Sequence, residues 1–166
     1  TAINFLIAQG NYVFGPSIRV NDDAAGTYYH STTQRSIGCR GDTIYLIWRD
    51  DRYGNSSWFN SRIFFSKSTD AGATWLPSIM ISQDDDTLWG YQPHVAFDSY
   101  GNIYCAYNVI NWNNSNRDIH FTKSTDGGAS FSVPIIVNDS IEVRHQRSYA
   151  VAVDSSGQYV YVAWED

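Results

Sequence analysis

The chain has 166 residues and a formal net charge of -6, and 16% of its residues are aromatic while only 17% are charged. This length suits about one domain with a sizeable core, and the apolar content excludes a disordered protein. No apolar run approaches the roughly 20 residues that span a bilayer. Because lysine occurs only twice, a nucleic-acid partner is also not expected.

The residue types predict strands rather than helices. The only glutamates are Glu142 and Glu165, and lysine and leucine are also scarce. Tyrosine, isoleucine, valine, tryptophan and threonine are frequent, together with the serine, asparagine and aspartate that favour turns. The chain is therefore predicted to be all-β.

Two kinds of segment alternate along the chain from residue 37 onward. The first kind has two short, mostly apolar strands, a and b, joined by a tight turn that contains glycine; it occupies residues 37–48, 95–107 and 151–164. The second kind has a strand c, an Asp/Gly turn and, after a proline, a strand d; it begins at residues 62 and 118. Four strands per repeat, at a period of roughly 50 residues, are typical of a β-propeller blade.

The two ends of the chain fit the same frame. Residues 1–22 line up with strands c and d, and residues 149–166 supply strands a and b and then stop. We therefore expect one domain with a half blade and its connection at 1–33, blades at 34–90 and 91–146, and a half blade at 147–166. Three blades cannot close a ring, because propellers need about four to eight.

The incomplete ring leaves two alternatives. In the first, the chain pairs with a copy of itself to give a six-bladed homodimer, and the b strand ending at Asp166 pairs with the c strand near Ile3. In the second, the chain is a piece of a longer propeller. The chain begins at Thr1 without a signal-peptide pattern, which suits either a processed chain or an excised piece.

The Asp/Gly turns carry a family resemblance. Residues 68–75 read Ser-Thr-Asp-Ala-Gly-Ala-Thr-Trp, and residues 124–131 repeat this with conservative changes at the last two positions. The motif resembles the Asp box, or BNR repeat, of sialidase-like β-propellers. The resemblance implies a structural turn on the outer rim, with no catalytic role for its residues, which are Ser68, Asp70, Gly72, Trp75, Ser124, Asp126, Gly128 and Phe131.

The same resemblance implies where a ligand would bind. In sialidase-like folds the ligand lies over the central axis, near the starts of the a strands and the b-to-c loops. The candidate ligand-binding residues there are Arg35, Arg49, Asp50, Arg52, His94, Trp112, Arg147 and Tyr149. Guanidinium groups and aromatic faces suit a sugar. The alternative for Arg49, Asp50 and Arg52 is a set of ion pairs that fastens one loop.

The resemblance gives little support for catalysis. A sialidase would need three arginines, a tyrosine nucleophile with a glutamate beside it, and an aspartate acid/base. The chain lacks the Phe/Tyr-Arg-Ile-Pro motif that usually carries the first arginine, and Glu142 and Glu165 lie in an apparent connection and at the chain end. No catalytic residue is therefore assigned.

No cofactor or metal is expected. The chain has no Gly-rich phosphate loop and no H-E-x-x-H motif. Cys39 and Cys105 fit no metal-site spacing, and we expect both to be free and buried in strands.

Three functions remain open on these grounds. The first is a secreted, non-catalytic module that binds a glycan or another surface ligand. The second is a glycoside hydrolase or a fragment of one, and the third is a structural assembly subunit. Glycosylation sequons at Asn55, Asn113 and Asn138 favour an extracellular or periplasmic location.

Overall fold

The computed structural model describes residues 2–5, 8–9, 13–24, 28–53, 60–139 and 146–165. All the regular elements in these ranges are β-strands, and the strands pair antiparallel. The prediction of an all-β chain is confirmed. Within the same ranges there is no helix long and apolar enough to cross a membrane.

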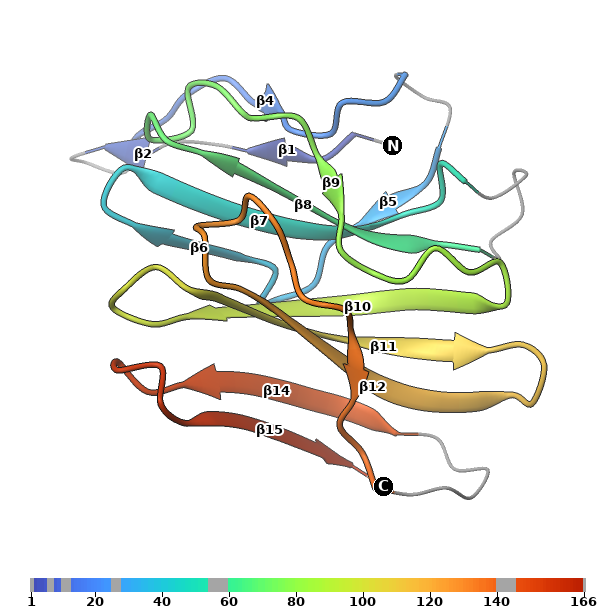
Figure 1. Cartoon of the computed structure of the whole chain (residues 1–166). Coiled ribbons are helices and arrows are strands. Elements are labelled where there is room, and N and C mark those ends of the chain that lie inside the picture. Colours follow the sequence, from blue (N-terminus) through green and yellow to red (C-terminus); the bar gives the residue numbers. More distant parts are fainter. Residues whose placement is uncertain are drawn as a thin grey trace.

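Two larger sheets repeat one strand order along the chain (Figure 1). The first contains β5 (His30–Ser31), β6 (Ile37–Arg40), β7 (Thr43–Asp50), β8 (Arg62–Ser68) and β9 (Ile79–Met80), with β5 and β6 both paired to β7. The second contains β10 (Leu88–Phe97), β11 (Ile103–Asn111), β12 (Asn116–Ser124) and β13 (Ile135–Ile136) in sequential order. The segments that repeat in the sequence thus occupy matching places in the two sheets.

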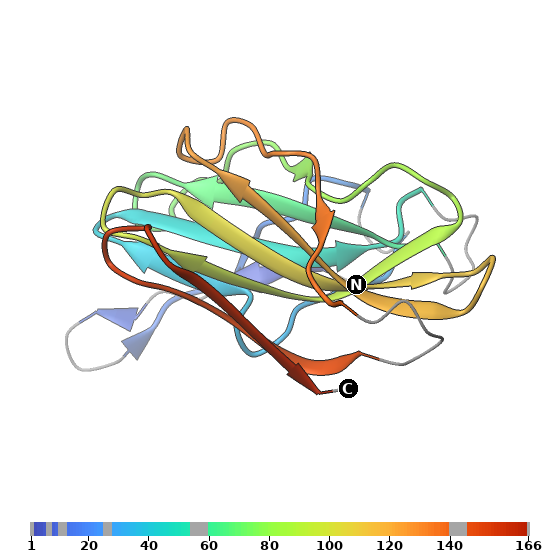
Figure 2. The ribbon, with the colours of Figure 1, turned by 60° about the horizontal axis from the view of Figure 1, so that its bottom comes forward.

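Smaller pairs lie at the two ends of the molecule. Figure 1 shows β1 (Asn4–Phe5) and β4 (Ile18–Arg19) at the top, and β14 (Arg147–Val153) and β15 (Val160–Glu165) at the bottom. A short hairpin, β2 (Ala8–Gln9) with β3 (Val13–Phe14), follows β1. In Figure 2 the β14–β15 pair forms an outer layer on one side of the larger sheets.

The β1–β4 pair is built like the last two strands of each larger sheet, β8–β9 and β12–β13. The Val20 N–H donates to the Ile3 carbonyl at 2.8 Å, as Ile81 does to Ile63 at 2.8 Å. In return the Ile3 N–H donates to the Asn21 side chain at 2.8 Å. The second larger sheet repeats both bonds through Val137, Ile119 and Asn138. The pair β1–β4 is therefore the counterpart of β8–β9 and of β12–β13.

Apolar side chains fill the space between successive sheets. Tyr45, Ile47, Ile63 and Phe65 from the first larger sheet form one cluster with Ile103, Cys105, Tyr107 and Val109 from the second. Two smaller clusters flank it. Ile3 and Val20 pack against Trp48 and Phe64, and Tyr149 and Val151 pack against Ala106 and Ile119. Stacked sheets with apolar inner faces explain why both strand a and strand b read as largely apolar.

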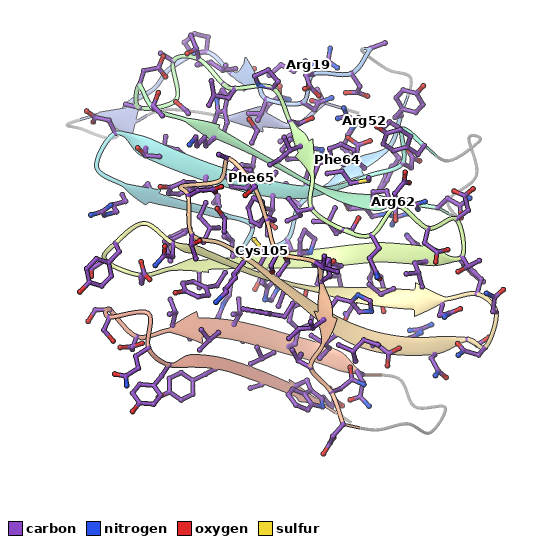
Figure 3. The ribbon with its side chains drawn as sticks, viewed as in Figure 1. Arg19, Arg52, Arg62, Phe64, Phe65 and Cys105 are labelled. Carbon is purple, nitrogen blue, oxygen red and sulfur yellow. The ribbon has the colours of Figure 1, made fainter. Side chains whose placement is uncertain are left out.

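The expectation that both cysteines are buried is wrong for one of them. Cys105 is fully buried between the larger sheets (Figure 3), whereas Cys39 is exposed, and both are free thiols. Cys39 lies on β6, and the β1–β4 pair covers only the outer part of that sheet face. The physical reason is thus the incomplete layer above β6.

The repeated Ser-Thr-Asp segments form the same turn twice. The Ser68 hydroxyl donates to Asp70 at 2.7 Å and accepts from the Gly72 N–H at 2.8 Å, while Asp70 accepts from the Thr74 N–H and hydroxyl. The second turn repeats these bonds at matching lengths through Ser124, Asp126, Gly128 and Ser130. The bonds from Thr74 and Ser68 lower the pKa of Asp70 to about 2.

The aromatic residue that ends each turn packs inward. Trp75 contacts the cluster around Trp48, and Phe131 meets Phe65 edge-on at 5.0 Å between ring centroids. Glycine is needed because Gly72 and Gly128 have φ of 90° and 86°. The hydrogen bonds, the positive φ of the glycines and the ring contacts thus give the residues of both segments a part in forming and packing the turn.

Candidate ligand-binding site

The strand that matches strand a of the sequence repeat, here called the inner strand of each sheet, is irregular at the same place. In β10 the pairing with β11 shifts between Tyr91 and His94, and Gln92 has a φ of 50°. In β14 the pairing with β15 shifts between Arg147 and Ala150. In the first larger sheet the inner strand is divided into β5 and β6 at the corresponding point. Such bulges redirect side chains out of a regular ladder.

A cavity of about 610 Å³ lies at these irregular positions. It is lined by Thr33, Gln34, Tyr91, Gln92, His94, Arg117 and Tyr149. The lining therefore combines hydroxyl, amide, imidazole and guanidinium groups with two phenol rings. Among the described residues that line it, none carries a carboxyl group.

The walls of the cavity are tied together across two sheets. The hydroxyls of Thr33 and Ser36 donate to the Pro93 carbonyl at 2.6 and 2.9 Å. These bonds attach the turn before β6 to the bulge of β10. The two irregular segments are thus held in a fixed relation, as a preformed binding site requires.

Gln92 is held in one orientation by a buried neighbour. The Asn108 side-chain amide donates to the Gln92 Oε1 at 2.9 Å, and Asn108 is almost fully buried. Because the Gln92 oxygen accepts this bond, its amide NH₂ remains as a pair of donors. A non-glycine residue with positive φ is strained, and such strain often accompanies functional sites.

His94 lines the cavity with a partly buried imidazole whose neutral form is favoured. Burial lowers the pKa of His94, and the nearby charge of Arg35 lowers it further. Its ring lies 4.6 Å from the Tyr149 ring, and its buried Nδ1 has no hydrogen-bond partner within the described part of the chain. A neutral imidazole can both donate and accept one hydrogen bond.

An aromatic cluster adjoins the cavity through Tyr91. The ring of Tyr91 lies 5.7 Å from Trp89, which stacks on Trp112 at 5.7 Å and 8° between planes. The buried guanidinium of Arg49 lies 4.7 Å from the Trp89 ring and 5.3 Å from the Tyr29 ring. Two predicted site residues, Arg49 and Trp112, therefore belong to this cluster and not to the cavity lining.

Asp50 and Arg52 belong to an ion-pair cluster away from the cavity. Arg52, labelled in Figure 3, donates to the buried Asp50 at 2.7 Å and to Asp22 at 2.9 Å. Asp50 also accepts from the Trp48 indole at 3.0 Å. This is the arrangement expected for ion pairs that fasten a loop, because both side chains bond each other instead of facing the cavity.

The structure brings together only part of the predicted set. His94 and Tyr149 line the cavity, and Arg35 lies in the exposed turn before β6, where its charge acts on His94. Arg147 begins β14 opposite Glu165, but its side chain lies outside the described residues. Thr33, Tyr91 and Arg117 line the cavity and were not selected from the sequence.

Comparison with known proteins supports the fold. No protein-family model and no curated protein matches the sequence. Among solved structures, a Hadza microbial sialidase matches with a TM-score of 0.51 and 22% identity over 61% of this chain and 25% of its own. An α-L-arabinanase of Penicillium chrysogenum, solved with arabinobiose, matches with a TM-score of 0.59 and 13% identity over 89% of this chain and 45% of its own.

Both neighbours are β-propeller glycoside hydrolases. At these identities the likeness shows the fold, so the chain has the antiparallel sheet arrangement of a β-propeller. The chain spans a quarter of the length of the sialidase and less than half of the arabinanase.

Proposed function

We propose that this chain is a non-catalytic, sialidase-like propeller module that binds a glycan in the cavity at the bulges of its inner strands. The observation that carries the proposal is the lining of that cavity, where the Gln92 amide, held by Asn108, and the Arg117 guanidinium occur together with the rings of Tyr91 and Tyr149. Sugars offer hydroxyl groups to such donors and C–H faces to aromatic rings. The glycoside hydrolases among the structural neighbours add support at the level of the fold.

The lining favours binding over hydrolysis. Most glycoside hydrolases require two carboxyl groups placed about 5–10 Å apart across the scissile bond. A sialidase, whose nucleophile is a tyrosine, still needs a glutamate beside it and an aspartate acid/base. The described lining residues supply no carboxyl group. Asp50 lies away from the cavity and is engaged by Arg52 and Trp48. Hydrolysis remains the second candidate because the structural neighbours are hydrolases, and it is tested below.

An extracellular or periplasmic location is part of the proposal. Of the three sequons, Asn113 is exposed in the turn between β11 and β12 and could carry a glycan. Asn138 instead uses its side chain in two structural hydrogen bonds, to the Ile119 N–H and to Asp118. Asn55 lies outside the described residues.

The test is a binding titration with two sugars of different charge. Arabinobiose and N-acetylneuraminic acid would be titrated into the chain by calorimetry and by saturation-transfer NMR. We expect one of them to bind, and Arg117→Ala to weaken that binding at least about tenfold, the equivalent of 1.4 kcal/mol. Arg40→Ala is the matched control, because Arg40 is an exposed arginine at the far end of β6.

Three results would count against the proposal. The first is no binding of either sugar at millimolar concentration, and the second is equal binding by the Arg117→Ala variant. The third is turnover of a fluorogenic sialoside or arabinoside by the wild-type chain, which would establish the hydrolase alternative.

A further inference from the structure

The β14–β15 pair leaves an apolar groove beside it. This groove has a volume of about 530 Å³ and lies between β15 and the outer strands of the second larger sheet. Its apolar lining includes Phe121, Val133, Ile135, Val160 and Val162. Val133 is 78% exposed and Ile135 is 58% exposed, although their neighbours in the groove pack against the core.

A second groove lies at the opposite end of the molecule. It has a volume of about 250 Å³ and lies between β1 and the inner strands of the first larger sheet, with Ile3, Asn4, Ile37 and Leu46 in its lining. Ile37 is 47% exposed there. Its counterpart in the second larger sheet, Val95, is only 8% exposed because a complete sheet covers it.

The two grooves border complementary halves of a sheet. The β1–β4 pair has the backbone bonds of an outer pair of strands, as β12–β13 has. The β14–β15 pair has the pairing and the bulge of an inner pair, as β10–β11 has. Each groove therefore lies where the missing half of a sheet would be, and each end of the chain carries the half that the other end lacks.

We infer that the groove beside β15 binds the β1–β4 pair of a second copy of this chain, and that the second groove receives the β14–β15 pair of that copy. The outer edge of β15 has no strand on it within the described residues, and such edges readily accept another chain. The inference concerns a surface distant from the sugar cavity and does not depend on the proposed function.

The register of the new pairing follows from the complete sheets. There, Asn108, Tyr107 and Ala106 pair with Ile119, His120 and Phe121. The matching bulges align Glu165 of β15 with Asn108 of β11. The matching backbone bonds align Ile3 with Ile119. The expected pairs are Glu165 with Ile3, Trp164 with Asn4, and Ala163 with Phe5.

The geometry of a propeller limits the number of copies. Each chain would contribute two complete units, one of them with its first strand divided into β5 and β6, and two halves, hence three units in the closed assembly. Closed propellers contain about four to eight units, so two copies give a ring of six, whereas one copy or three copies fall outside this range. The expected assembly is a closed twofold dimer.

The first test is the mass of the chain in solution, measured by light scattering over a hundredfold range of concentration. We expect twice the mass of one chain at the upper concentrations, with no larger species. A single-chain mass throughout would overturn the inference, and would suit a longer polypeptide whose own next strands fill the groove. Polymers that grow with concentration would also overturn it, because the ring would not close.

The second test uses two lysine substitutions on one strand. Ile135 and Ile136 are neighbours on β13 with similar exposure, 58% and 55%, but only Ile135 lines the groove. We expect Ile135→Lys to weaken the dimer at least tenfold and Ile136→Lys to leave it unchanged. Val133→Lys, outside any strand, is the second variant should Ile135→Lys fold poorly. Equal dimerisation by all of these variants would contradict the assigned surface.

Discussion

Asp50 is a buried carboxylate whose partners come from its own segment, residues 48–52, and from β5. It accepts hydrogen bonds from the Trp48 indole, from the Arg52 backbone and from the Arg52 guanidinium. The imidazole of His30, on β5, lies 3.1 Å away. A buried charge is tolerable only when it is paired and hydrogen-bonded in this way, so this one side chain holds the end of β7 in place.

Replacing Asp50 with asparagine is expected to lower the free energy of unfolding by about 3 kcal/mol, because it leaves the partly buried Arg52 without its main counter-charge. Asp22→Asn is the control, since Asp22 is 38% exposed and pairs with the same arginine. That control should cost about 1 kcal/mol or less. Urea denaturation at neutral pH measures both, and equal losses for the two variants would contradict the burial argument.

The cost of Asp50→Asn should also depend on pH. Burial alone would raise the pKa of Asp50, but hydrogen bonds from His30, Arg52 and Trp48 outweigh it and hold this pKa well below its usual range. A lowered folded-state pKa gives stability that is complete above the ordinary value of about 3.9 and is lost as pH falls toward the lowered value. The difference between wild type and variant should therefore shrink below about pH 4. A difference in urea midpoint that stays constant from pH 7 to pH 3 would refute this.

At the scale of elements, the second Ser-Thr-Asp turn shows what a single glycine does between two sheets. Gly127 and Gly128 both have positive φ, 67° and 86°. A Cβ on Gly128 would lie 2.6 Å from the Phe65 ring, whereas on Gly127 it would meet only the Lys67 Nζ at 3.8 Å. The first turn has Ala71, with a φ of 57°, at the position of Gly127, so an alanine is accepted there but not one residue later.

Gly128→Ala is expected to destabilise the chain by about 1–3 kcal/mol more than Gly127→Ala, because both pay for positive φ but only the first overpacks the core. Thermal unfolding followed by near-ultraviolet circular dichroism measures the difference, and the signal of nearby aromatic rings reports directly on Phe65 and its neighbours. Indistinguishable midpoints would show that the Phe65 ring moves aside at little cost.

The elements were largely predictable because their pattern repeats. The alignment of residues 1–22 with strands c and d predicted the pairing of β1 with β4, and the register of Phe5 with Ile18 agrees with it. The division of one inner strand into β5 and β6 was not predictable, since residues 32–36 contain ordinary polar residues. Gln92 likewise shows no sequence sign of its positive φ.

The cavity was predictable only where a residue followed the strand pattern. Tyr149 lies near the start of β14, as expected, whereas β10 already begins at Leu88 and His94 lies at its bulge. Both residues line the cavity. Tyr91 and Arg117 were not selected, because they face the cavity through the bulge of β10 and the start of β12. Glutamine recurs at 34 and 92, each shortly before a segment predicted as strand a, and both residues line the cavity.

At the scale of the whole molecule, Cys39 is exposed because no complete sheet covers β6 at this end of the molecule. Its counterpart in the second larger sheet is Phe97, which contacts Tyr45 of the preceding sheet at 5.3 Å between ring centroids. The matching tyrosine on β15 is Tyr161, which is 60% exposed. Closure between two copies would therefore place Tyr161 of one copy over Cys39 of the other.

The two thiols should consequently differ in reactivity with a disulfide reagent. Cys105 is fully buried and burial raises its pKa, so it should react only after unfolding. Cys39 should react in the native chain, and more slowly as the concentration rises and the dimer forms. The Ile135→Lys variant separates this effect from crowding or reagent depletion, since it should keep Cys39 reactive at every concentration. If Cys39 reacts at one rate in the wild type throughout, β6 is not covered by a second copy and closure must occur elsewhere or not at all.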